Sequence, residues 1–514
     1  MGGNLSSELK SSKYKKREIV DLRKMNIDKL PPTIGALQCK ELLLSENDLV
    51  TIPEEIGKLG KVEIIDFSKN RINYVPPEIG ELSTLKQLFL SNNKLFFSPL
   101  TPKIGSLKNL TRLDLSSNQL DDLPVEISQC EALEFLDLSD NQLQSFPLEY
   151  GKLYNLQTFN ISKNQLKSLP QEISGWVKLT ELDVSSNQLT LLPNQIVLLG
   201  LLATLNVGFN KLQQLPEDLS NMVSLTDLDL KVNPPLAYIP QLSNLRQLKK
   251  LSIRNLQITH LPIGLGLLSE LIELDIRDNP QLKEIPYDIA TLINLQRLDL
   301  FGNNMRIVPR EIGNLINLHT LDLRSNKLTI DNIPSEIGKL VNLKKLLLSA
   351  NLLVALPPEI SNMKNLKEFE CSNNQLAAVP VEIGELTGLT KINLSGNKLT
   401  SLPPSFGNLG ELQIADLKSN EISELPTTLN GLKNCTKIDL SHNMLTELPW
   451  EFGDLIQLTI LDVGHNPLTI PPNPIVMKGT DAIIKWLKAN EKEGRKGKVS
   501  GLGIVQDEPD GKKK

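Results

Sequence analysis

Hydrophobic and polar positions along the chain follow one pattern that returns about every 23 residues. The unit has the form LxxLxLxxNxLxxLP, and twenty copies align with their ninth positions running from Met25 to Asn466. Eighteen of these ninth positions are Asn, and the two exceptions are Met25 and Leu256. A period this regular indicates a single repeating structural unit, so the chain length does not translate into a number of ordinary domains.

Each unit contains a short stretch that alternates with a period of two. In residues 110–116, Leu113 and Leu115 alternate with Arg112, Asp114 and Ser116. This alternation predicts a short strand with one buried face, and such a strand must stack on the strand of the next unit to bury that face. The sequence therefore predicts an α/β solenoid over residues 17–478, a curved horseshoe with a parallel sheet on its concave face.

The Asn after each strand occupies the point where the chain turns away from the sheet. Its amide both donates and accepts hydrogen bonds, so we expect stacked Asn side chains to satisfy inward-pointing backbone groups. The following string, LPxxIGxLxNL, returns along the convex side, as at Leu123 and Pro124. There Pro fixes φ and Gly permits a tight bend, which predicts short helical or irregular pieces.

The two ends depart from the pattern. Residues 1–16 form a basic arm that we expect to be disordered, and its start matches M-G-x-x-x-[ST] with Gly2 and Ser6. This match predicts myristoylation of Gly2 supported by the neighbouring basic residues, whereas the alternative is a chance Met-Gly start. Residues 479–492 predict a capping helix with Thr480 as its N-cap, and residues 493–514 predict a disordered tail.

Composition removes several function classes. The chain has 514 residues, a net charge of −5, four His and four Cys. The net charge gives no reason to expect nucleic-acid binding, and the four His are scattered along the sequence. No phosphate-binding loop, nucleophile elbow or metal-ligand spacing is present, so we expect no enzyme activity, cofactor or metal. Each Cys replaces a repeat Leu or other apolar residue, which predicts buried reduced thiols.

The outward strand positions carry the chemistry that the repeat does not require. The central outward position is acidic in thirteen of twenty units. Two residues later the usual Ser is replaced in five consecutive units by Lys231, Arg254, Arg277, Phe301 and Arg324. Stacking places these side chains next to a set of acidic residues and one further arginine, namely Asp229, Asp275, Asp299, Asp322 and Arg297.

This set has two interpretations. In the first, each basic residue pairs with a neighbouring Asp and the set is a solvated charge ladder of little energetic consequence. In the second, the set is a partner-binding stripe with an aromatic anchor, because Arg and exposed aromatic residues are enriched at interface hot spots. A second candidate patch lies nearer the N-terminus and consists of Leu43, Ile64, Phe89 and Phe135.

The repeats resemble a known family. The string LxxLxLxxNxLxxLPxxIGxLxNL, seen over residues 110–133 and 318–343, is similar to the intracellular Ras-group leucine-rich-repeat proteins. The opening MGGNLSSELK and the closing NPLTIPPNPIVMKG resemble the social-amoeba branch of this group most closely. The resemblance implies a leucine-rich-repeat horseshoe and a cytoplasmic regulator acting between Ras-type signalling and the actin cytoskeleton in chemotactic movement. It also implies a concave-face partner, a small GTPase or its effector complex.

Two other functions stay open. The chain could be a regulatory subunit that inhibits or targets a phosphatase or cyclase, although no basic-x-Val-x-Phe docking string lies near the N-terminus. It could instead be a membrane-anchored structural adaptor that works through an acylated basic arm at the inner leaflet of the plasma membrane. The sequence names neither the partner nor the oligomeric state.

Overall fold

The computed structural model describes residues 17–96 and 100–494. Contacts divide the chain into two compact units, Met1–Leu271 (unit 1) and Ile272–Lys514 (unit 2), and each is described by itself. The predicted acylation site Gly2, the basic arm over residues 1–16 and residues 495–514 of the predicted tail lie outside the described residues. The least regular part of the sequence pattern, which surrounds Leu256, lies close to the boundary between the units.

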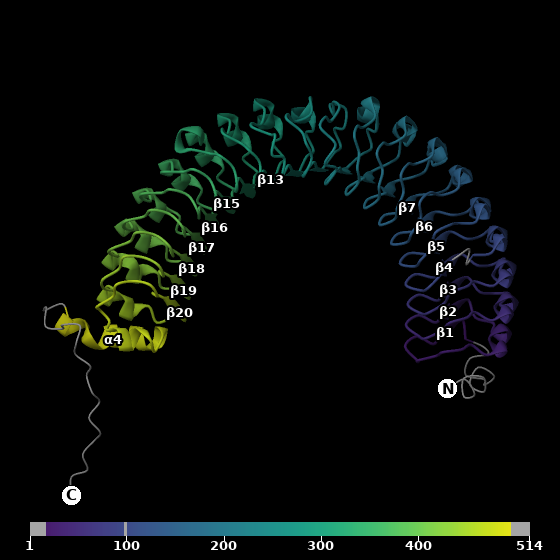
Figure 1. The fold of residues 1–514 in the computed structure, drawn as a ribbon, viewed down its shortest axis with the longest axis horizontal. Helices are drawn as coiled ribbons and strands as arrows, with labels where there is room; N and C mark the ends of the chain where they lie inside the picture. The colour runs from purple at the N-terminus through teal and green to yellow at the C-terminus, as the bar shows by residue number, and fades with distance from the viewer. Residues whose placement is uncertain (1–16, 97–99, 495–514) are drawn as a thin grey trace, which may run out of the picture. The chain divides into compact units, whose positions relative to one another are not determined.

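Short parallel strands form one side of each unit, as Figure 1 shows. The described part of unit 1 contains β1 (Ile19–Asp21), β2 (Glu41–Leu43), β3 (Ile64–Asp66), β4 (Gln87–Phe89), β5 (Arg112–Asp114), β6 (Phe135–Asp137), β7 (Thr158–Asn160), β8 (Glu181–Asp183), β9 (Thr204–Asn206), β10 (Asp227–Asp229) and β11 (Lys250–Ser252). The described part of unit 2 contains β12 (Glu273–Asp275), β13 (Arg297–Asp299), β14 (Thr320–Asp322), β15 (Lys345–Leu347), β16 (Glu368–Glu370), β17 (Lys391–Asn393), β18 (Ile414–Asp416), β19 (Lys437–Asp439) and β20 (Ile460–Asp462).

The strands confirm the predicted period of two. Within each unit every strand pairs in parallel with the next, and equivalent positions lie side by side, as Leu113 does with Leu136. The middle residue of each strand is buried, and the residues on either side of it face the inner surface. Because no strand is longer than three residues among those described, its stability comes from stacking on its neighbours.

The outer side of each unit carries short 3₁₀ helices, which confirms the expected helical pieces (Figure 1). In unit 1 these are η1 (Pro32–Ala36), η2 (Glu54–Lys58), η3 (Pro77–Glu81), η4 (Pro102–Ser106), η5 (Val125–Gln129), η6 (Leu148–Lys152), η7 (Gln171–Gly175), η8 (Asn194–Leu198), η9 (Glu217–Asn221) and η10 (Leu265–Leu267). In unit 2 they are η11 (Tyr287–Thr291), η12 (Arg310–Asn314), η13 (Ile330–Asn332), η14 (Ser335–Lys339), η15 (Pro358–Asn362), η16 (Val381–Glu385), η17 (Pro404–Asn408), η18 (Thr427–Gly431) and η19 (Trp450–Asp454).

The repeat Asn residues form the predicted ladder. The Asn141 amide donates to the carbonyl oxygens of Leu115 and Leu138, each at 3.1 Å. Its Oδ1 accepts the backbone N–H of Leu120, in the preceding repeat, at 2.9 Å. Asn141 is buried, so one side chain joins backbone groups of two repeats and supplies the acceptor that the buried Leu120 N–H requires.

The Gly of the repeated Ile-Gly pair has a different role from the one expected, as Gly80 illustrates. The sequence suggested that Gly permits a tight bend, but Gly80 has no positive φ. Instead, a Cβ added to Gly80 would lie 2.4 Å from the carbonyl oxygen of Lys103 in the next repeat. The bend expectation was therefore wrong at this position, and Gly is required because adjacent 3₁₀ helices pack closely there.

The four cysteines are buried and unpaired, as predicted. Burial raises the pKa of Cys39 and of Cys130 to about 11, and it raises the pKa of Cys435 to about 11 as well. A high pKa keeps a thiol protonated and poorly reactive at neutral pH. These residues therefore fill the core as protonated thiols.

A longer helix covers the last repeat of unit 2. After α3 (Asn473–Val476), α4 (Thr480–Gly494) buries Ile483 and Leu487 against η19. Trp486 stacks on Trp450 with ring centroids 5.8 Å apart. Thr480 is the first helical residue and not the N-cap that we expected. Its Oγ1 instead accepts the Leu461 N–H at 2.8 Å, because β20 has no following strand to accept it.

Across the described residues, no helix has the length and hydropathy that a bilayer crossing requires.

Candidate protein-interaction surface

The acidic residues at the central outward position have a structural role that the sequence analysis missed. Asp114 Oδ1 accepts the backbone N–H of Ser116 at 3.0 Å and its hydroxyl at 2.7 Å. The carboxylate thus caps the turn that follows the strand. The same contact to the residue two positions later recurs at Asp66, Asp137, Asp183, Asp229, Asp275, Asp322, Asp439 and Asp462. The acidic column is therefore first a feature of the fold, and the second oxygen of each carboxylate is left for other contacts.

In unit 2, Arg277 uses that second oxygen. Its Nε lies 2.8 Å from Asp275 Oδ1 and its NH2 lies 2.7 Å from Asp275 Oδ2. The same guanidinium reaches Asp299 on the next strand, with Nε 3.3 Å from Oδ2. The hydrogen bonds that Arg277 donates to Asp275 raise the pKa of Arg277, so this arginine stays charged and is held in one geometry.

Asp299 is the most unusual carboxylate in this set. Its side chain is 5% exposed, and Arg297 approaches it only to 3.7 Å. Burial and the neighbouring Asp322 raise the pKa of Asp299 to about 6, although Arg277 opposes this shift. Its charge therefore changes near pH 6.

Phe301 and Arg324 form the aromatic part of the predicted stripe. The guanidinium carbon of Arg324 lies 5.6 Å from the centroid of the Phe301 ring. Its NH2 lies 2.5 Å from Asp322, and its NH1 lies 3.6 Å from Glu370. Both carboxylates are largely buried, so Arg324 is a cation held in place beside the Phe301 ring.

A further ion network in unit 2 was not predicted from the sequence. Glu368 accepts from Lys345 at 2.8 Å and from Lys391 at 2.7 Å, and Lys391 also reaches Glu370 at 2.6 Å. Burial opposes ionisation of Glu368, but the two lysines outweigh it and hold its pKa at about 2. The signal was available, because Lys345, Glu368 and Lys391 alternate in sign at the first outward position of consecutive strands.

The remainder of the predicted stripe lies in unit 1. Lys231 Nζ lies 2.5 Å from Asp229 Oδ2 and 5.6 Å from the centroid of the Phe209 ring. Arg254 makes no ion pair among the described residues, and its Nε is buried without an acceptor. The predicted stripe is thus distributed over the two units, and each ion pair described above joins residues of the same unit.

The second candidate patch also has a basic residue that the sequence analysis did not include. The guanidinium carbon of Arg112 lies 3.5 Å from the centroid of Phe135 and 5.6 Å from that of Phe89. Leu43 and Ile64 lie half-exposed on the neighbouring strands of the same face. The structure therefore brings the predicted aromatic pair together around one cation.

Comparisons with known proteins agree with the repeat pattern. Residues 288–390 match the family described as a leucine-rich repeat region, and residues 102–143 and 387–445 match the leucine rich repeat family. The "Leucine-rich repeat protein lrrA" of Dictyostelium discoideum is 90% identical over 507 residues, covering 99% of this chain and 99% of the relative. The chain belongs to the leucine-rich repeat proteins. The resemblance of the sequence to a social-amoeba leucine-rich-repeat protein is thereby confirmed.

Solved structures of leucine-rich repeat proteins share the fold. The plant peptide hormone receptor RGFR1, solved in complex with RGF2, has a TM-score of 0.68 and 30% identity, covering 86% of this chain and 81% of that one. A TDR receptor has a TM-score of 0.66 and 25% identity, covering 86% of this chain and 89% of the receptor. YopM from Yersinia enterocolitica has a TM-score of 0.59 and 25% identity, with 88% of each chain covered.

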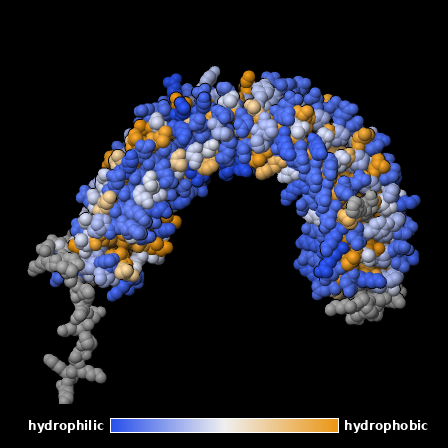
Figure 2. Space-filling model, in the orientation of Figure 1, coloured by the Kyte–Doolittle hydropathy of each residue, from blue (hydrophilic) through white to orange (hydrophobic). Residues whose placement is uncertain are grey.

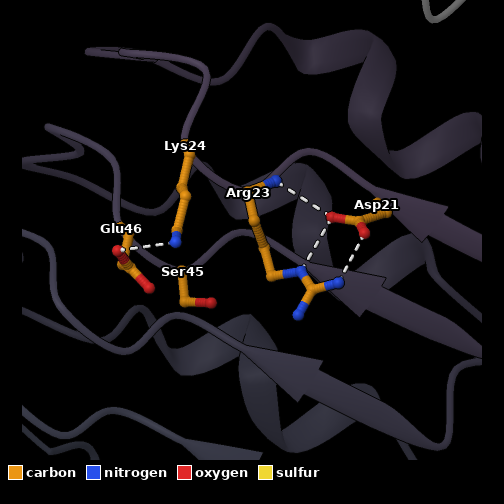
Figure 3. Close-up of a pocket in the computed structure, with 5 residues that line it drawn as sticks. All are labelled: Asp21, Arg23, Lys24, Ser45 and Glu46. Atoms are coloured by element: carbon orange, nitrogen blue, oxygen red, sulfur yellow. Dashed lines mark hydrogen bonds and ion pairs between the residues drawn. The ribbon is translucent and has the colours of Figure 1, made fainter.

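The leucine-rich repeat chain also has a polar pocket at the N-terminal end of unit 1 (Figure 3). Its volume is about 370 Å³, and Figure 3 shows Arg23 turned onto Asp21 and Lys24 onto Glu46. The Arg23 NH2 lies 2.6 Å from Asp21 Oδ2, and this hydrogen bond lowers the pKa of Asp21 to about 2. The two basic residues of this pocket, Arg23 and Lys24, are thus already paired with acids of the repeats.

Histidines are less scattered in the fold than in the sequence. The rings of His442 and His465 stack with centroids 4.1 Å apart, because the two residues occupy the same position in adjacent repeats. Residues 17–96 and 100–494 contain no cluster of three or more His, Cys, Asp or Glu that could hold a metal ion. Figure 2 shows hydrophilic side chains over most of the visible surface, with hydrophobic ones in small separate groups.

Proposed function

We propose that this leucine-rich repeat protein is a non-enzymatic scaffold whose inner face in unit 2 binds a signalling protein. The partner is a Ras-type small GTPase or its effector complex, and binding regulates actin remodelling and chemotactic movement. The residues that carry the contact are Arg277, Arg297, Asp299, Phe301 and Arg324. The family and the 90% identical lrrA support the resemblance from which the Ras and cytoskeletal roles were inferred.

The observation that carries the proposal is the arrangement of Arg324 and Phe301. A cation and an aromatic ring lie 5.6 Å apart on the inner face, and two largely buried carboxylates fix the cation. Preorganised Arg and aromatic side chains lose little conformational entropy when a partner binds, which makes them good interface anchors. Arg297 is half-exposed beside them and supplies a charge for the partner to meet.

A protein partner also agrees with the known structures. RGFR1, at 30% identity, was solved in complex with RGF2, a case in which a protein of this fold holds another molecule. The internal ion pairs of Arg277 and Asp275 do not oppose this use. They neutralise the buried acids of the inner face, so a partner does not have to desolvate an isolated carboxylate.

The proposal includes a cytoplasmic location, with contact at the inner face of the plasma membrane through an acylated Gly2. Arg23 and Lys24 are paired with Asp21 and Glu46, so we assign the membrane contact to the arm and not to the repeats. Fractionation of cells expressing Gly2→Ala tests this part. We expect the variant to leave the membrane fraction and to keep its binding to the protein partner, whereas a membrane adaptor would lose its function together with its anchor.

Binding to a purified Ras-type GTPase, loaded with either a GTP analogue or GDP, tests the protein contact. The useful variant is Arg297→Glu combined with Phe301→Ala, because neither residue holds a buried group by itself. We expect at least a tenfold loss of affinity. Lys437→Glu is the control, since Lys437 occupies the position of Arg297 on β19 and makes no ion pair among the described residues. Equal affinity of both variants would contradict the proposed surface.

A further inference from the structure

Arg112 on β5 of unit 1 occupies an environment that differs from that of Arg277 and Arg324. Those two arginines follow an Asp by two residues and fold back onto it. Arg112 precedes Asp114 by two residues, and its guanidinium carbon lies 3.5 Å from the Phe135 ring centroid. Its Nε is buried and has no hydrogen-bond acceptor. Arg112 is thus a cation held by aromatic rings and not by a carboxylate.

The strand register explains why no carboxylate in the part of the chain that the structure describes forms an ion pair with Arg112. The residues beside it at the same strand position are Gln87 on β4 and Phe135 on β6. In unit 2 the equivalent position alternates in sign, so that Lys391 meets Glu368 there. Arg112 makes no ion pair among the described residues, because its lateral neighbours carry no charge.

The nearest acids of the inner face each place a carboxylate oxygen in the turn that follows their strand. Asp114 Oδ1 accepts from the N–H and the hydroxyl of Ser116. Asp137 Oδ1 accepts the N–H of Ser139 at 2.9 Å, and its Oδ2 accepts from Asn160 at 3.3 Å. These contacts hold both carboxylates in the turn that follows the strand. Among the described residues, neither carboxylate forms an ion pair with Arg112, so its guanidinium N–H groups are available to an acceptor from another molecule.

We propose that Phe89, Arg112 and Phe135 form a docking site for a protein segment that presents one carboxylate beside an apolar side chain. The planar guanidinium donates two parallel hydrogen bonds to a carboxylate, and the rings on either side of it exclude water from this pair. Ile64 and Leu43 continue the surface along β3 and β2 and receive the apolar side chain. This site lies in unit 1 and does not depend on the proposed function of unit 2.

Charge around the site restricts the partner further. Asp66, Asp114 and Asp137 occupy the neighbouring outward column, and they make no ion pair among the described residues. A second carboxylate on the partner would lie against this column and would be repelled. The site therefore fits a segment with a single acid and does not fit a polyacidic one.

Selection of a displayed random peptide library on the full-length protein tests the inference. We expect enriched peptides to carry one Asp or Glu next to a large apolar residue. For one such peptide, Arg112→Gln and replacement of the peptide acid by its amide should each weaken binding about tenfold or more. The double change should weaken binding little further, because both changes remove the same contact.

The controls separate the guanidinium from charge and from folding. Arg71→Gln removes an exposed arginine that pairs with Asp48 away from the rings, and it should leave peptide binding unchanged. Arg112→Lys keeps the charge but not the planar pair of donors. This variant should therefore lose most of the affinity for the peptide, while its melting temperature stays that of the native chain. Enriched peptides without an acid, or equal binding by the native chain and Arg112→Gln, would overturn the inference, as would a failure to enrich any peptide.

Discussion

Arg324 and Glu370 lie two repeats apart in sequence and form an ion pair with 3.6 Å between NH1 and Oε2. The strand between them contributes Leu347, which lies in register with Asp322 on one side and with Glu370 on the other. Leu347 faces the inner surface and yet is only 8% exposed. Arg324 thus spans three consecutive repeats of unit 2. We expect it to contribute both to the stability of the fold and to the proposed binding surface.

Replacing Arg324 by Ala should destabilise unit 2 by about 1–3 kcal/mol, because it leaves the buried carboxylate of Asp322 without its counter-ion. The shift in the urea unfolding midpoint measures this cost. Lys364→Ala is the control, since Lys364 pairs with Glu385 on the surface where both side chains are more than half exposed. That change should cost less than about 1 kcal/mol. Equal costs would show that the inner ion pairs contribute no more than surface pairs.

The raised pKa of Asp299 predicts a specific pH dependence. The folded chain binds the Asp299 proton more tightly than the unfolded chain does, with a pKa of about 6 against 3.8. The folded state therefore carries the extra proton between about pH 4 and pH 6, and this contribution to stability is lost as the pH rises through that window. The size of the effect is about 3 kcal/mol, from roughly 1.4 kcal/mol for each pKa unit.

Asp299→Asn removes this titration. Urea unfolding at each pH gives the unfolding free energies of the variant and of the native chain. The variant's value minus the native value should rise as the pH increases from 4 to 7. The contributions of the other titrating groups cancel in this difference. A difference that stays constant or falls with pH would show that Asp299 is not held protonated by burial and by Asp322.

The close packing of 3₁₀ helices predicts opposite outcomes at two glycines. Gly80→Ala should cost about 1–3 kcal/mol, because its Cβ would lie 2.4 Å from the Lys103 carbonyl oxygen. Gly60→Ala should change stability by less than about 0.5 kcal/mol, because a Cβ at that position has no neighbour within 4 Å. Thermal unfolding followed by circular dichroism distinguishes them, and similar melting temperatures for both variants would contradict the packing argument.

The Asn ladder predicts a third contrast. Asn141→Ala should cost about 1–3 kcal/mol, since it leaves the buried Leu120 N–H without its acceptor and removes one of the two Asn donors from the Leu115 and Leu138 carbonyl oxygens. Asn155→Ala should cost under about 1 kcal/mol, because its amide donates only to the exposed Glu131 carbonyl at 2.8 Å. Chemical denaturation gives the free energy of unfolding of each variant. If Asn141→Ala lowers it by no more than Asn155→Ala does, water can replace the hydrogen bonds of the ladder.

Much of the fold could be predicted because one physical constraint repeats. Each repeat must bury a middle strand residue such as Leu113. Each must also give hydrogen-bond partners to the backbone of the following turn, as Asn118 does. Periodicity therefore revealed the strands, the ladder and the buried thiols. Periodicity did not reveal why Gly is needed at position 80. A tight bend and a close contact with a neighbouring helix both favour Gly, and only the three-dimensional structure distinguishes the two reasons.

The sequence could predict which residues belong to the candidate surface, but not which of them form ion pairs with one another. Sequence spacing placed Arg277 and Arg324 beside acids, but the reach of Arg324 to Glu370 depends on its rotamer. The pKa of Asp299 depends on burial that the pattern could not show. Arg112 was missed because it lies at a position where most repeats carry unremarkable polar residues, and its two aromatic neighbours lie one repeat away on each side.

The most direct test of the scaffold account is proximity labelling in motile cells, comparing the native chain with Arg297→Glu combined with Phe301→Ala and with the control Lys437→Glu. The account predicts that a Ras-type GTPase or its effector is labelled by the native chain and by the control and is lost from the double variant. An identical set of labelled proteins for all three chains would contradict it.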